Sequence, residues 1–206
     1  MSAAIKLSPG DAISICERVY ILIRRVGGGC QFKTWLVERQ DDGHSYVAKI
    51  TTIQKRVLRE LKAYLYLKME CYPERYYSEF VIFDYEAYVI RNHSRIGRKQ
   101  SVILLKYLDH DRFNTLKNYL DEQSGQIFGK EKNKIVGKIK RRVEELHALG
   151  VSHGDLHKDN IMIKISRKGS VTIRLIDFGS SCIQDDTNKQ RDLKSLSRIT
   201  QAVLNS

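Results

Sequence analysis

Hydrophobic positions in the first half of the chain cluster in short blocks, as expected for strands separated by turns. The blocks cover residues 20–26, 34–37, 45–50, 80–90 and 102–107. They are rich in β-branched and aromatic residues, and a basic loop is predicted at 91–99 between the last two. Between Lys55 and Met69 the apolar residues instead recur every three or four positions, which predicts one helix.

Helical spacing dominates the second half. The helical segments are 113–120, 135–149 and 193–203. The longest is expected to end at Gly150, and alternating apolar residues in 161–165 and 171–175 predict a hairpin. Because strands and helices are segregated along the chain, we expect an α+β fold with a strand-rich lobe at 1–105 and a helical lobe at 106–206.

Composition narrows the class of protein. The chain has 206 residues, and its 36 Lys and Arg residues exceed its 24 Asp and Glu residues by 12. It has no apolar run of the ~20 residues that a membrane helix needs, and its N-terminus lacks the apolar region of a secretory signal. The four cysteines form no metal-binding or disulfide-like pattern. We therefore expect an intracellular, cytoplasmic protein without membrane contact, the nucleus being the alternative location.

The excess positive charge is uneven. Seven basic residues and one acidic residue lie between Lys130 and Arg142, and a second cluster comprises Arg91, Arg95, Arg98 and Lys99. Such clusters attract nucleic acid, acidic proteins or phosphorylated substrates, although they can also be solvated faces that keep a protein soluble. We expect a protein substrate with an acidic or phosphorylated surface, and a nucleic-acid-associated partner is the second expectation.

Two polar motifs carry the candidate chemistry. His153-Gly154-Asp155-Leu156-His157-Lys158-Asp159-Asn160 lies between the long helix and the hairpin, and Ile176-Asp177-Phe178-Gly179 follows the hairpin. Asp155, Asn160 and Asp177 supply carboxylate and amide oxygens, which suit Mg²⁺ better than zinc. Phosphoryl transfer needs metal ions to neutralise phosphate oxygens and a separate carboxylate to take the proton of the attacking hydroxyl.

Together, the two motifs resemble the catalytic and metal-binding loops of the protein-kinase-like superfamily. The resemblance implies a single two-lobed kinase-like domain over residues 1–206, with ATP and Mg²⁺ as cofactors. It further implies Asp155 as the catalytic base, Asn160 and Asp177 as metal ligands, and Phe178 as a packing residue.

The strand-rich half extends this resemblance. Gly27, Gly28 and Gly29 lie between two candidate strands and resemble a phosphate-binding glycine loop, although Phe32 stands at its third glycine position and the run could be a plain turn. Lys49 resembles the lysine that holds the α and β phosphates. The resemblance implies that Glu60 pairs with Lys49; the alternative is a solvated helix residue.

An adenine pocket is also implied by the resemblance. Val47, Leu105 and Met162 would enclose the base, and backbone groups of Lys106 and Leu108 would hydrogen-bond to it. The three apolar residues could equally belong to an ordinary core. On the last helix, Asp192 resembles a buried aspartate that anchors the catalytic loop backbone, which makes it a structural candidate.

The chain also departs from usual protein kinases. It stops where they have several more helices, so we expect a minimal helical lobe that needs a partner chain to complete it. Gly154 replaces an arginine that pairs with a phosphorylated activation loop, so such control is not expected. His157 replaces the lysine of Ser/Thr kinases, and the pattern HGDLHxxN is typical of aminoglycoside and choline phosphotransferases.

These observations favour an ATP- and Mg²⁺-dependent Ser/Thr protein kinase of minimal size. The first alternative is a kinase-fold enzyme that phosphorylates a small-molecule hydroxyl, which His157 favours. The second is a kinase-fold binding module with weak catalysis, which the altered glycine loop favours.

Overall fold

The computed structural model of the protein describes residues 6–15, 17–27, 32–70, 80–91, 94–108, 113–123 and 125–206. Contacts divide the chain into two compact units. Residues 1–61 and 78–107 form the first unit, and residues 62–77 and 108–206 form the second. None of the described helices is both long and apolar enough to cross a membrane.

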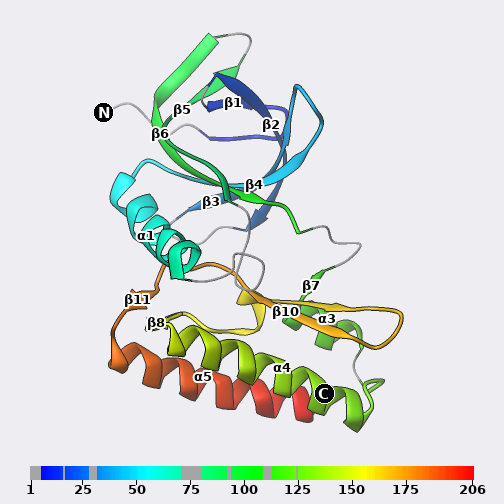
Figure 1. The fold of residues 1–206 in the computed structure, drawn as a ribbon. Helices are drawn as coiled ribbons and strands as arrows, with labels where there is room; N and C mark the ends of the chain where they lie inside the picture. Colours follow the sequence, from blue (N-terminus) through cyan, green and yellow to red (C-terminus); the bar gives the residue numbers. More distant parts are fainter. Residues whose placement is uncertain are drawn as a thin grey trace. The chain divides into compact units, whose positions relative to one another are not determined.

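Six antiparallel strands of the first unit close into a barrel (Figure 1). They are β1 (Ala12–Ile15), β2 (Arg18–Gly27), β3 (Lys33–Arg39), β4 (Ser45–Thr51), β5 (Phe80–Arg91) and β6 (Ser94–Lys106), in the order β1-β2-β3-β4-β6-β5. The barrel closes because β1 pairs with both β2 and β5. Alternate residues such as Tyr20, Leu22, Val37 and Ala48 fill its core, as the period of two along a strand requires.

Two features of this unit differ from the sequence-based expectation. The prediction of a loop over 91–99 is wrong from Ser94 onward, because pairing of Ile90 with Arg95 and of Arg91 with Ser94 continues the β5–β6 ladder. Exposed basic side chains are compatible with a strand whose backbone is paired, so charge alone was a poor indicator of a loop. Strand β1 was not predicted, because four residues are too few to show a periodicity.

Helix α1 (Gln54–Glu70) follows β4 and agrees with the helical spacing from Lys55 to Met69. One face of the helix is buried at Val57, Glu60 and Leu61. Glu60 is the exception on this apolar face, and a buried carboxylate requires a partner.

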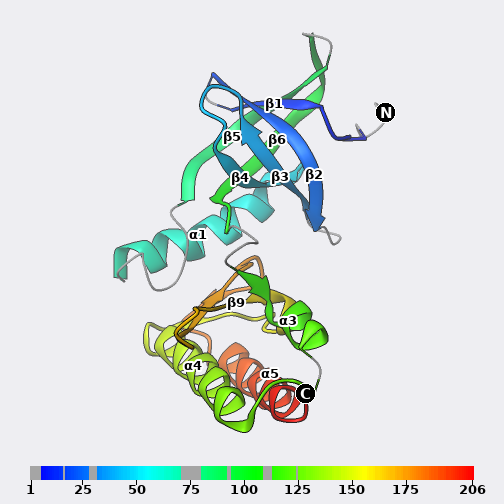
Figure 2. The ribbon, with the colours of Figure 1, turned by 90° about the vertical axis from the view of Figure 1, so that its right-hand side faces the viewer.

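Among its described residues, the second unit contains the end of α1 from Lys62, three further helices, short strands and one 3₁₀ turn (Figure 2). The elements are β7 (Asn114–Thr115), α3 (Leu116–Glu122), α4 (Gly129–Ala148), β8 (Val151–Ser152), η1 (Lys158–Asn160), β9 (Ile161–Ile165), β10 (Val171–Leu175), β11 (Cys182–Ile183) and α5 (Asp186–Leu204). The predicted hairpin is confirmed as β9 and β10, and it lies over α4, which packs along α5 (Figure 1).

Helix ends in this unit follow capping chemistry. The Thr115 side chain accepts a hydrogen bond from Asn118 N, so α3 begins at Leu116. Gly150 has φ +76° just after α4, the conformation in which glycine commonly ends a helix. Helix α5 begins seven residues before the predicted segment, because Asp185 caps a polar first turn that shows no hydrophobic spacing.

Candidate active site

In the first unit, a buried ion pair joins β4 to α1. Lys49 Nζ lies 2.7 Å from both carboxylate oxygens of Glu60, and the two side chains are only 5% and 0% exposed. Burying both charges costs hydration free energy, and the hydrogen bonds from the ammonium to both carboxylate oxygens offset that cost. The structure thus contains the pair that the sequence predicted, while the part of each residue in a reaction stays a prediction.

Phe32 adds a contact that sequence reasoning missed. Its buried ring lies 4.8 Å from Lys49 Nζ, within the range of a cation–π interaction. The sequence showed only that Phe32 stands where a glycine was expected. Gly27 ends β2, whereas Gly28 and Gly29 lie outside the described residues.

The predicted adenine residues are distributed over both units. Val47 on β4 is the cross-strand partner of Leu105 on β6, so the two side chains share one face of the sheet. It is the face opposite Ala48, whose side chain fills the barrel core. Lys106 is the last residue of β6, and Leu108 lies two residues later and is half-buried. Met162 is buried on β9 of the second unit.

In the second unit, Asp192 of α5 fixes the backbone that precedes Asp155. Its carboxylate accepts hydrogen bonds from His153 N at 2.6 Å and Gly154 N at 2.9 Å, and His147 Nε2 lies 3.0 Å away. Asp192 is 1% exposed, so these contacts replace the water that a carboxylate would otherwise need. This geometry agrees with the anchoring role expected for Asp192.

His153 links the two polar motifs, which the sequence did not reveal. Its Nε2 donates to Ile176 O at 2.9 Å, so Nδ1 is the nitrogen that accepts from Asp155 N at 3.3 Å. Burial is the largest influence on this ring and lowers the pKa of His153, which favours the neutral form that these two bonds require.

Asp177 follows Ile176 in a left-handed conformation, with φ +66°. Such a conformation is uncommon outside glycine, and it persists only where surrounding contacts hold it. Phe178 supplies them: its ring is fully buried, with ring centroids 5.5 Å from Tyr64 and 5.1 Å from His153. Gly179 N also donates to Asp177 Oδ1 at 3.3 Å.

Asn160 is held by its amide nitrogen. Nδ2 lies 2.9 Å from the carbonyl oxygen of Asp155 and 3.0 Å from His157 Nε2. A carbonyl can only accept, so the Asn160 amide donates, and the second contact is a hydrogen bond when His157 Nε2 is unprotonated. His157 Nδ1 lies 3.4 Å from the Asp159 carboxylate and 3.3 Å from Asp159 N. Oδ1 of Asn160 accepts no hydrogen bond from the described residues.

The donor set of this loop fits a hard cation. Mg²⁺ prefers oxygen ligands and binds through one or two protein groups together with substrate phosphates. Asn160 Oδ1 and the Asp177 carboxylate are groups of that kind. In the described part of the chain, no three His, Cys, Asp or Glu side chains gather into a metal-binding group. With two protein ligands, substrate phosphates and water would complete the coordination of Mg²⁺.

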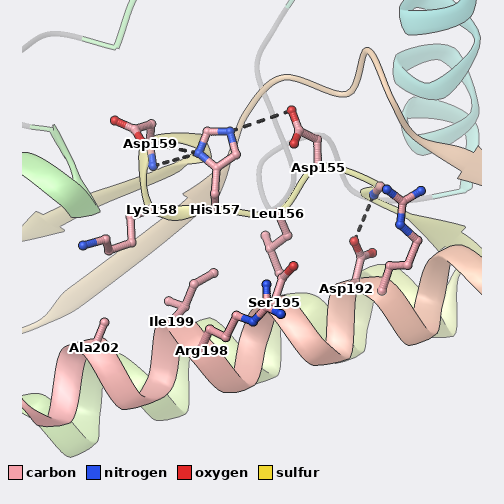
Figure 3. A pocket seen from close by; sticks show the side chains of 12 residues that line it. Asp155, Leu156, His157, Lys158, Asp159, Asp192, Ser195, Arg198, Ile199 and Ala202 are labelled. Atoms are coloured by element: carbon pink, nitrogen blue, oxygen red, sulfur yellow. Dashed lines mark hydrogen bonds and ion pairs between the residues drawn. The ribbon is translucent and has the colours of Figure 1, made fainter.

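Asp155 itself is accessible. Its side chain is 59% exposed, and His157 Nε2 lies 3.7 Å from its Oδ2 (Figure 3). A pocket of about 450 Å³ adjoins it between the loop 154–159 and α5. A reactant in this pocket would therefore lie beside the Asp155 carboxylate.

Residues 20–200 match the family model described as the protein kinase domain. No curated protein sequence matches the chain. Among solved structures, the chain is similar to the crystal structure of the BubR1 kinase domain, with a TM-score of 0.64 and 16% sequence identity over 89% of this chain. The match covers 53% of that solved chain, so this chain spans about half of its length.

Proposed function

Because the chain belongs to the protein kinase domain family, we propose that it transfers the γ-phosphoryl group of Mg-ATP to a serine or threonine hydroxyl of a protein. The observation that carries the proposal is the buried pair of Lys49 and Glu60. A lysine with so little exposure is costly to maintain for stability alone, because two buried charges gain little over apolar side chains of similar size.

Each polar group has a defined task in this proposal. Lys49, held by Glu60, would bind phosphate oxygens, and Asn160 with Asp177 would hold Mg²⁺. The ion would neutralise charge on the transferring phosphoryl group. Asp155 would orient the substrate hydroxyl and accept its proton, which its exposed carboxylate can reach. His153 and Asp192 would keep the Asp155 backbone in place.

A small-molecule acceptor is the second candidate. His157 favours it, because this loop carries an imidazole where Ser/Thr protein kinases place a lysine. The imidazole Nε2 lies 3.0 Å from the amide nitrogen of Asn160. The two candidates use the same ATP chemistry and differ only in the acceptor, so an acceptor panel separates them.

The decisive experiment is a radiolabelled-ATP assay with Mg²⁺ and a panel of acidic proteins, basic proteins and small alcohols. We expect label transfer to protein serine or threonine. Asp155→Asn should lower kcat by about 10³-fold or more, because the proton acceptor is lost, while ATP affinity stays within about threefold. Full activity of Asp155→Asn would contradict the mechanism, and ATP binding without transfer to any acceptor would favour a binding module.

A further inference from the structure

The pocket between the catalytic loop and α5 has charged walls (Figure 3). Lys158 contributes from the loop, and Arg191, Ser195 and Arg198 contribute from α5. Asp155 lines the same pocket, so a ligand here is adjacent to the proposed proton acceptor.

The cations in this pocket have no acidic partners. Among the described residues, Lys158 and Arg198 form no ion pair, and Arg191 donates only to the neutral amide oxygen of Asn188 at 3.1 Å. Each of these cations can therefore pair with an anionic group of a ligand.

Three carboxylates, those of Asp155, Asp159 and Asp192, line the same pocket, so its formal charges balance and the placement of each group decides what a ligand meets. Asp192 is buried and accepts the hydrogen bonds of His153 N and Gly154 N. Asp159 lies 3.4 Å from Nδ1 of His157. In the proposed function the exposed Asp155 carboxylate meets the substrate hydroxyl, which leaves Lys158, Arg191 and Arg198 to meet the residues beside that hydroxyl.

Spacing along α5 indicates the form of that ligand. Arg191 and Arg198 are seven residues apart, which places them on one side of the helix and about 10 Å apart along its axis. Side chains on one face of an extended chain recur about every 7 Å, so two acidic residues of an extended segment can pair with the two arginines separately.

We propose that this pocket binds acidic side chains of the protein substrate, and so selects serine or threonine residues that lie within an Asp- and Glu-rich segment. The inference rests on the proposed function and adds the substrate class. Arg191 and Arg198 are its specificity-determining residues, and Lys158 supports them from the loop.

The test compares three acceptor peptides of equal length with one serine each. The flanking residues are Asp and Glu in the first peptide, Gln and Gly in the second, and Lys and Arg in the third. With the full chain and Mg-ATP, we expect the KM of the acidic peptide to be at least roughly tenfold below that of the neutral peptide, a difference of about 1.4 kcal/mol.

Arg198→Glu should raise the KM of the acidic peptide by roughly fivefold to tenfold, because it replaces an attraction with a repulsion, and should change the neutral peptide little. Arg198→Gln should show a smaller rise and guards against misfolding of the charge-reversed variant. Lys138→Glu is the matched control, since it makes the same charge change at an exposed site on α4 outside the pocket. It should leave both KM values unchanged.

Equal KM values for acidic and neutral peptides, a preference for the basic peptide, or the same effect from Lys138→Glu as from Arg198→Glu would overturn the inference while leaving phosphotransfer intact. If no peptide accepts phosphate, the proposed function fails instead. Fluorescence anisotropy of the labelled acidic peptide then still tests the pocket, because equal affinity for the unmodified chain and Arg198→Glu would overturn it.

Discussion

At the scale of single residues, Gly154 fixes how closely the loop 153–160 approaches the segment after Asp177. Its φ is +77°, and a Cβ atom added there would lie 2.2 Å from the backbone oxygen of Ser180. Both the conformation and the space therefore require glycine. A side chain at this position would push apart two segments that each carry a proposed reactive group.

Gly154→Ala should consequently lower the free energy of unfolding by at least about 2 kcal/mol, the sum of a left-handed alanine and a backbone overlap. Urea unfolding measures the change. Gly169→Ala is the matched control, because Gly169 has a similar φ of +71° but only the end of the Lys134 side chain nearby. It should cost about 1 kcal/mol. Equal losses for the two variants would contradict the overlap argument.

The buried pair of Lys49 and Glu60 predicts a non-additive result. Glu60→Gln leaves an uncompensated ammonium in the protein and should destabilise it by about 3 kcal/mol. The double variant Lys49→Met with Glu60→Leu removes both charges and should be more stable than Glu60→Gln. It should nevertheless be inactive, because the lysine that is proposed to hold the ATP phosphates is lost. Thermal unfolding and the ATP assay separate the two effects, and a double variant that is no more stable than Glu60→Gln would argue against the pair.

At the scale of elements, an ion pair supports the closure of the barrel by β1. It joins Asp11, just before β1, to Arg91 at the end of β5, and we call it the clamp. Arg91 donates to both carboxylate oxygens of Asp11, at 2.7 and 2.5 Å, and Ser8 N donates to the same carboxylate at 2.9 Å. The hydrogen bonds from Arg91 are the largest influence and lower the pKa of Asp11 below its usual value. The clamp is therefore strongest when Asp11 is ionised.

This clamp predicts acid sensitivity of the first unit. Since the folded state lowers the pKa of Asp11, its stabilising contribution is present above the unfolded value of about 3.9 and is lost as pH falls through the lower folded value. Asp11→Asn should be less stable than the unmodified chain at pH 7, and the difference should shrink below about pH 4. Urea unfolding at pH 7, 5 and 3 measures it, and a difference independent of pH would contradict the clamp.

Element boundaries also show how far the sequence alone could reach. Helices α1 and α4 and the β9–β10 hairpin were predictable because their apolar residues keep one period over many positions. The start of α5 was not, because its first turns are polar and depend on the Asp185 cap. The contacts of Phe32 with Lys49 and of His153 with Ile176 join residues far apart in the chain, and no local pattern encodes them.

At the scale of the whole molecule, ligand binding should appear as stability. If Asn160 and Asp177 hold Mg²⁺ with ATP phosphates, Mg-ATP at 100 times its Kd should stabilise the chain by about 2.7 kcal/mol. Asp177→Ala should remove the part of this stabilisation that depends on Mg²⁺ and keep the part given by ATP alone. Thermal unfolding with ATP, with and without Mg²⁺, measures both parts. A Mg²⁺ increment that survives in Asp177→Ala would exclude Asp177 as a ligand.

Closure of the barrel has a consequence for association. An open sheet exposes unpaired backbone groups along its outer strands, and these recruit strands from other chains into aggregates. Among the described strands of the first unit, each pairs with two neighbours, so a foreign strand finds no free ladder there. That protection depends on the four residues of β1, and detaching them would uncover β2 and β5 together.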